Sequence, residues 1–175
     1  RASTISKTNT YLGSEATRDK WWQFFADKLK QGRQGFVVAP LVRGAADTAV
    51  NSVEKLYESM VHGPLEPFRV GLIHGQQTSN EKQSTMDKFA SGQLQVLVAT
   101  GVIEVGIDVP NATVMTIESA ERFGLSQLHQ LRGRVGRGQH PGYVCAFATS
   151  QEPTEIERLN AFAEIDNGFD LAQAD

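Results

Sequence analysis

What the sequence lacks already excludes several classes of protein. Cys145 is the only cysteine among 175 residues, which rules out an intrachain disulfide and a cysteine-based metal cluster. This usage fits a reducing cytosol, so we expect a cytoplasmic protein. No apolar run reaches membrane-spanning length, and no membrane partner is expected. The formal net charge is −3, whereas a protein that coats nucleic acid is usually basic. Any contact with nucleic acid should therefore be local.

A phosphate-binding loop is also missing from the sequence. No G-x-x-x-x-G-K-[ST] segment occurs, and the glycine-containing stretch at residues 32–35 is too short and has no lysine. No Asp-Glu pair follows a predicted strand in the manner of a Mg²⁺-binding Walker B site. The chain by itself is therefore not expected to hold the β- and γ-phosphates of a nucleotide. Because it begins at Arg1 and stops at Asp175 without a closing structural signal, we expect it to be part of a longer protein.

What is present is an alternation of apolar runs and amphipathic segments. Short apolar runs predict buried strands at residues 36–39, 69–73, 96–99, 112–117 and 143–148. Helical spacing, caps and stop signals predict helices at residues 17–31, 45–61, 78–90, 125–131 and 152–165. Such alternation is typical of an α/β fold with a mostly parallel sheet covered by helices on both faces. In such sheets, ligands bind at the carboxyl ends of the strands.

The start of the chain is predicted to be extended. Residues 1–16 are mostly polar, so we expect an extended segment followed by one domain over residues 17–175. Trp21 and Trp22 could stack on bases. Their spacing with Phe25 and Leu29 on one side of the predicted helix favours a place in the core instead.

The sharpest motif runs from Gln130 to Arg137 and reads QLRGRVGR. Arg134 and Arg137 lie three residues apart at the end of a predicted helix, and the neighbouring glycines allow a phosphate or a backbone to approach closely. The arginine fork suits phosphate oxygens, and charge that builds on a transferred phosphoryl group needs such a partner. The alternative is a solvated basic helix end stabilised by the helix dipole.

Two motifs resemble those of superfamily-two helicases. Residues 130–137 resemble motif VI, and residues 100–110, which read TGVIEVGIDVP, resemble motif V in the expected order. Over about residues 70–148, the sequence resembles that of the RecG-type DNA helicases more closely still. The resemblance implies a RecA-like three-layer fold and identifies the chain as the second, C-terminal motor domain of such an enzyme.

The resemblance also implies roles for residues at a nucleotide. Arg137 would be the arginine finger that reaches the γ-phosphate across a cleft between two motor domains. Arg134 would be a second contact, and Gln130 would help to orient both arginines. Gly106 and Asp108 would lie at the nucleotide, with Asp108 near the ribose.

A second set of residues would face the DNA strand. Thr100 would touch a backbone phosphate, and His74 and Gly75 would present backbone amides to the same strand. Glu104 would link the nucleotide state to the grip on the strand. Each has an ordinary structural alternative, such as a strand-end hydroxyl, a loop histidine or a solvated carboxylate.

Two positions depart from the family pattern. Gly101 stands where RecG-type relatives usually carry a second threonine, which removes a hydroxyl near the strand. Arg43 lies in a stretch that is acidic in those relatives, and it is either a further DNA contact or a solvated loop arginine.

The resemblance finally implies ligands and partners. ATP and Mg²⁺ would be bound mainly by the missing N-terminal motor domain, so the chain alone is expected to be inactive as an ATP hydrolase. The complete enzyme would be a monomeric bacterial helicase that acts on branched DNA, at replication forks or recombination intermediates, in DNA repair. One alternative is a duplex translocase of the transcription-repair coupling type. The other is a non-catalytic nucleic-acid-binding or interaction module, favoured by the acidic net charge and the missing phosphate loop.

Overall fold

A single sheet of six strands organises the described part of the chain. The computed structural model describes residues 7–41, 46–100 and 108–164. The strand order is β1-β6-β5-β2-β4-β3, and each neighbouring pair is parallel. The strands are β1 (Thr8–Gly13), β2 (Gln34–Ala39), β3 (Val70–Ile73), β4 (Val96–Thr100), β5 (Ala112–Ile117) and β6 (Gly142–Phe147). The prediction of a mostly parallel sheet is confirmed.

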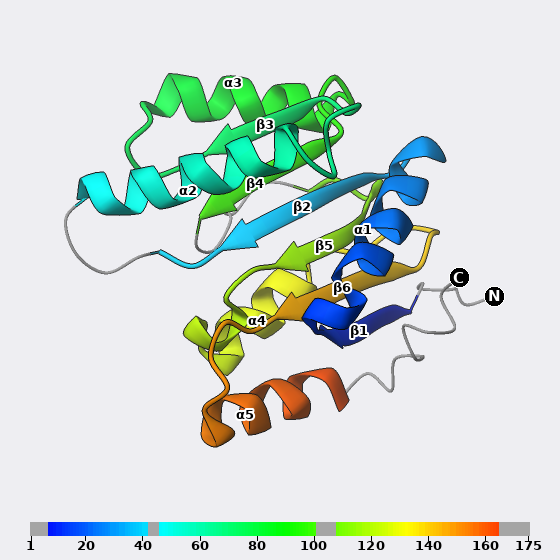
Figure 1. Ribbon diagram of the computed structural model, residues 1–175. Helices are drawn as coiled ribbons and strands as arrows, with labels where there is room; N and C mark the ends of the chain where they lie inside the picture. The colour runs from blue at the N-terminus through cyan, green and yellow to red at the C-terminus, as the bar shows by residue number, and fades with distance from the viewer. Residues whose placement is uncertain (1–6, 42–45, 101–107, 165–175) are drawn as a thin grey trace.

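Helices cover both faces of this sheet, as Figure 1 shows. Two apolar clusters lie on opposite faces: one contains the buried side chains of α1 and α2, and the other those of α3, α4 and α5. The helices are α1 (Glu15–Lys30), α2 (Ala46–Val61), α3 (Ser79–Ala90), α4 (Leu125–Arg132) and α5 (Pro153–Glu164), with a short 3-10 turn η1 at Ala120–Arg122. The three-layer fold is the one predicted.

The first strand corrects one prediction. The segment before residue 17 was expected to precede the domain, but β1 is an edge strand that pairs with β6 from Thr8↔Gly142 to Gly13↔Phe147. Its polar residues Asn9 and Thr10 are nevertheless buried. An edge strand is held by backbone pairing and can therefore lack the apolar run by which the inner strands were found.

The two tryptophans belong to the core. Trp21 is fully buried and Trp22 is 7% exposed. The indole Nε1 of Trp21 donates to Thr116 Oγ1 at 2.8 Å, which satisfies its polar end inside the fold. Packing was the favoured interpretation of the pair, and it is confirmed. Cys145 is buried as well, and burial raises the pKa of its thiol.

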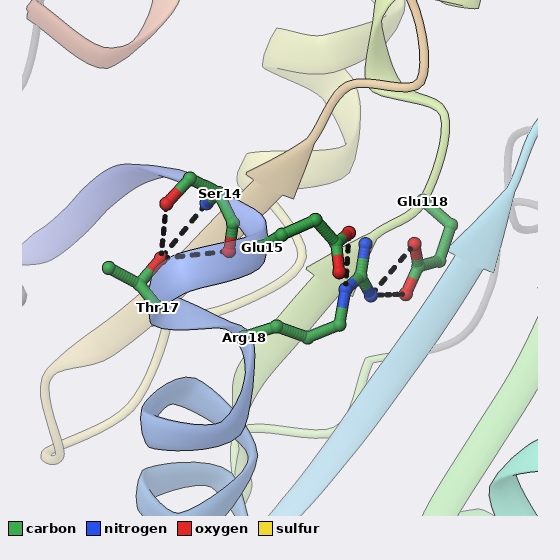
Figure 2. A network of polar contacts seen from close by, with 5 residues as sticks. All are labelled: Ser14, Glu15, Thr17, Arg18 and Glu118. Carbon is green, nitrogen blue, oxygen red and sulfur yellow. Dashed lines mark hydrogen bonds and ion pairs between the residues drawn. The ribbon is translucent and has the colours of Figure 1, made fainter.

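A charged contact attaches α1 to the carboxyl ends of the central strands. Arg18 Nη1 donates to Glu118 Oε2 at 3.0 Å, and Arg18 Nε donates to Glu15 Oε1 at 3.1 Å. Figure 2 shows this network beside the first turn of α1, where Thr17 Oγ1 accepts the backbone amide of Ser14 at 2.9 Å. The Arg18 guanidinium also lies 4.0 Å from the ring centre of Phe147. The carboxyl ends of β5 and β6 are thus occupied by structural contacts.

Glu121 makes a second polar link, between η1 and the loop after β6. The carboxylate is 4% exposed and accepts the backbone amide of Thr149 at 3.0 Å and the Thr149 hydroxyl. Burial, the largest influence, favours a raised pKa, but the hydrogen bonds from Thr149 outweigh it and the pKa of Glu121 is lowered. Arg158 of α5 donates to the Glu121 carbonyl oxygen, so three segments meet here.

Stability should depend on this carboxylate in acid. A group whose pKa is lowered by folding stabilises the fold above its unfolded pKa, and this contribution disappears as the pH falls through the lower folded value. We expect the stability advantage of the native protein over Glu121→Gln to be full at pH 7 and to shrink below about pH 4.5. Urea unfolding at pH 7 and at pH 3.5 measures this difference, with Glu157→Gln on the exposed side of α5 as the control. An equal difference at pH 7 and pH 3.5 would contradict the assignment.

Candidate nucleotide and strand-binding sites

The basic motif spans the last turn of α4 and the start of the loop that joins it to β6, at the amino ends of the strands. Its exposed Arg137 faces Asp108, with Nη1 and Oδ1 3.5 Å apart. Asp108 lies four residues before β5, so the two candidate nucleotide residues come from separate motifs. The Arg137 side chain is 47% exposed and the Asp108 side chain is 64% exposed. The structure therefore brings together two charged groups that the sequence analysis assigned to one ligand.

Two glycines let the loop pack closely enough for this contact. Gly136 has a φ of +73°, which favours glycine, and a Cβ there would collide with Thr8 Oγ1. A Cβ on Gly138 would lie 3.2 Å from both the Cβ and the carbonyl oxygen of Pro110. The loop thus touches β1 on one side of Arg137 and the Asp108–Pro110 segment on the other.

The segment that carries Asp108 is itself anchored to the fold. Asn111 Nδ2 donates to the Gly32 carbonyl oxygen at 2.8 Å and to Gln34 Oε1 at 3.1 Å. Gln34 is buried and donates to the carbonyl oxygen of Phe89 at 2.6 Å. Asn111 and Gln34 were not predicted from the sequence, because an amide after a proline and a polar residue at a strand start carry no specific signal.

The remaining members of the basic motif differ in burial. Gln130 lies on the exposed side of α4, and Arg134 is half-buried in the following turn. Arg132 is only 9% exposed, although it shares the motif. Its Nη1 donates to the Phe162 carbonyl oxygen at 2.8 Å and to Thr10 Oγ1 at 3.2 Å. Arg132 therefore joins α4 to α5 and β1, while the roles expected for Gln130 and Arg134 stay predictions.

The candidate strand-binding residues lie at the carboxyl ends of the strands. This carboxyl edge of the sheet is opposite the amino edge, where the strands begin and Arg137 lies. Thr100 ends β4, and the pairing Ile73↔Ala99 places His74 beside it at the carboxyl ends of β3 and β4. Gly75 is exposed, and no atom outside its chain neighbours lies within 4 Å of the position that a Cβ would take. Adjacent strands lie about 4.8 Å apart. Thr100 and the loop after β3 are thus close enough to contact one extended ligand.

A glutamine shapes the loop after β3. Gln77 Nε2 donates to the Leu72 carbonyl oxygen at 3.0 Å, and Gln77 Oε1 accepts the His74 amide at 3.3 Å. The His74 ring also accepts the Gln76 amide through Nδ1 at 3.2 Å. Because Nδ1 is an acceptor in this contact, a neutral His74 carries its proton on Nε2. The capping box of Thr78 and Glu81 then starts α3, as predicted.

The two groups of candidate residues therefore lie at opposite ends of the strands: Thr100 and His74 at the carboxyl ends, and Asp108 and Arg137 at the amino ends. Only the first pair lies at the end of the sheet where ligands were expected to bind. The reason is the crossover from β4 to β5, which carries motif V from the carboxyl edge to the amino edge of a sheet roughly 17 Å long. Gly101, Glu104, Gly106 and Arg43, which the sequence analysis also singled out, lie outside the described residues.

Within the described residues, no group of three His, Cys, Asp or Glu side chains could hold a metal ion. None of the described helices is both long enough and apolar enough to cross a membrane.

A parallel sheet in this strand order, covered by helices on both faces, is the fold of the RecA-like motor domains of helicases. The chain belongs to the family described as helicase conserved C-terminal domain, which matches residues 19–139. Among curated proteins, the chain is 40% identical over 169 residues to the ATP-dependent DNA helicase RecG of Bacillus subtilis, covering 97% of this chain and 25% of that protein. It is 43% identical over 166 residues to the RecG of Mycobacterium tuberculosis, covering 90% and 22%.

Solved structures agree with this assignment. RecG bound to a three-way DNA junction superposes with a TM-score of 0.79 at 38% identity, over 98% of this chain and 22% of that one. The C-terminal domain of the DEAD-box protein Dbp5 superposes with a TM-score of 0.58 at 18% identity, over 92% and 84%, which shows the shared fold alone. The chain spans about a quarter of the length of the curated relatives that it matches.

Proposed function

We propose that this domain is the C-terminal motor half of an ATP-dependent DNA helicase that acts on branched DNA. The observation that carries the proposal is the contact between Arg137 and Asp108 at an exposed edge, in a chain about 40% identical to RecG helicases. Exposed pairs of this kind contribute little to folding, so both side chains remain available to a ligand.

In this proposal the amino edge of the sheet faces ATP held by the N-terminal motor domain. ATP supplies the phosphoryl group whose transfer to water drives the motor. Arg137 donates to the γ-phosphate as charge develops on it, with Arg134 and Gln130 beside it. The chain has no phosphate-binding loop, so the partner domain holds the β-phosphate and Mg²⁺. Closure of the two domains then completes the site.

The carboxyl edge of the sheet would hold one DNA strand. Thr100, Gly75 and the Nε2–H of His74 offer hydrogen-bond donors to backbone phosphates, and such contacts position a protein without reading the sequence. The acidic net charge of the chain is compatible with this, since a few local donors suffice. Alternate grip and release at this edge, coupled to the nucleotide at the other, would move the domain along the strand.

The test is ATP hydrolysis by the full-length protein with forked DNA, linear duplex DNA, single-stranded RNA or no nucleic acid. We expect forked DNA to stimulate turnover most, and the 175-residue chain alone to release no phosphate above background. Arg137→Ala removes the proposed arginine finger, and Arg122→Ala, which removes an exposed arginine beyond the carboxyl end of β5, serves as its control. Equal stimulation by linear duplex would favour a duplex translocase instead. No stimulation by any nucleic acid would leave a non-catalytic interaction module as the better account.

A further inference from the structure

We infer that Asp108 is the positioning residue of Arg137, and that it acts by holding the guanidinium at the amino edge of the sheet before nucleotide arrives. The inference rests on the proposed function, because it concerns the same arginine. It differs from the role that the family resemblance implied, in which Asp108 lies near the ribose.

The geometry of the pair supports this role. Asp108 Oδ1 lies 3.5 Å from Nη1 of Arg137. A guanidinium has five N–H donors in a fixed planar fork, so a carboxylate at Nη1 leaves the donors on Nε and Nη2 available for phosphate oxygens. Arg137 can therefore keep its contact with Asp108 while it binds a second anion. A carboxylate beside Nη1 also favours the rotamers of Arg137 that keep the guanidinium at this side of the loop.

The backbone on both sides fixes the distance between the two residues. Gly138 packs against Pro110, two residues after Asp108, with so little space that a Cβ there would lie 3.2 Å from Pro110 atoms. Asn111 holds the same segment to the start of β2 through the Gly32 carbonyl oxygen. These contacts set the separation of the two loop backbones, so only the side-chain torsions of Asp108 and Arg137 remain to be set for the ion pair.

Both side chains of the pair are in contact with solvent. At 47% and 64% exposure, solvent screens the charges and the pair adds little to folding. What it changes is the freedom of the arginine side chain, which has many rotamers and loses them on binding. An arginine that is already oriented binds its phosphate with less loss of entropy.

The first readout needs neither nucleotide nor turnover. In the full-length protein without nucleotide, the rate of phenylglyoxal modification at Arg137 is followed by peptide mass spectrometry. We expect Asp108→Asn to raise this rate about two- to fivefold, the range that an exposed ion pair allows. The rate at Arg122, which is exposed and lies beyond the carboxyl end of β5, should not change. An unchanged rate at Arg137 would overturn the inference.

The second readout separates positioning from ribose binding. We expect Asp108→Asn to lower the DNA-stimulated kcat about two- to fivefold, because an exposed ion pair orients the guanidinium by no more than that factor, with KM for ATP and affinity for ADP unchanged. Asp108→Glu should restore part of kcat. The double variant Asp108→Asn/Arg137→Ala should have the same kcat as Arg137→Ala alone. If Asp108→Asn weakens the binding of ADP and of a non-hydrolysable ATP analogue equally and retains kcat, Asp108 is assigned to the ribose. If Arg137→Ala itself leaves turnover intact, the proposed function fails, while the modification rates still report on the pair.

Discussion

Replacement of Arg137 by alanine should lower DNA-stimulated ATP turnover of the full-length protein by about 10³-fold or more. An arginine that neutralises charge on the transferred phosphoryl group contributes about 10³–10⁵ to the rate in enzymes of this chemistry. Because its side chain is 47% exposed, its removal leaves no buried polar group unsatisfied. Thermal unfolding should therefore stay close to that of the native protein, since exposed substitutions change stability by about 0.5 kcal/mol or less.

Two variants make this measurement specific. Arg137→Lys keeps the charge but loses the planar fork, so it should recover only a small part of the rate. Arg122→Ala removes an exposed arginine from η1 and should leave the rate unchanged. Retention of full turnover by Arg137→Ala would mean that the basic motif is not catalytic. Loss of the fold in that variant would mean that Arg137 is a structural residue.

Arg132, five residues earlier, should show the reverse behaviour. Its guanidinium is 9% exposed, donates to the Phe162 carbonyl oxygen at 2.8 Å and lies 2.7 Å from His129 Nδ1. It also lies 4.5 Å from the ring centre of Phe162. Hydrogen bonds to a charged group contribute about 1.5–3 kcal/mol each, and their loss leaves buried acceptors without a donor. We therefore expect Arg132→Ala to destabilise the domain by about 3 kcal/mol.

Urea unfolding of the 175-residue chain measures this difference, and thermal unfolding should show a fall of about 6–12 °C. Arg132→Met is the matched variant, because it keeps the unbranched apolar stem of the side chain while it removes the donors. It should be destabilised less than alanine, since the longer side chain fills more of the buried space. A stability equal to the native value in both variants would contradict a structural role for Arg132.

The contrast between these arginines shows what a motif can and cannot specify. The order of glycine and arginine between residues 130 and 137 indicates phosphate chemistry, but it does not separate the buried arginine from the exposed one. Burial depends on which residues of α5 and β1 pack against α4, and those segments are more than 20 residues away in either direction. The same limit applies to β1, whose polar sequence does not indicate that it forms a strand paired with β6.

The sequence by itself determined the alternation of strands and helices, the core position of Trp21 and Trp22, and the candidate residues of motifs V and VI. Local periodicity and short-range motifs encode these features directly. Only the tertiary structure decided that Arg137 faces Asp108, that Arg132 is buried, and that the nucleotide and strand-binding candidates lie at opposite edges of one sheet. Each of these depends on strand order and on close packing between segments far apart in the chain, which no local pattern records.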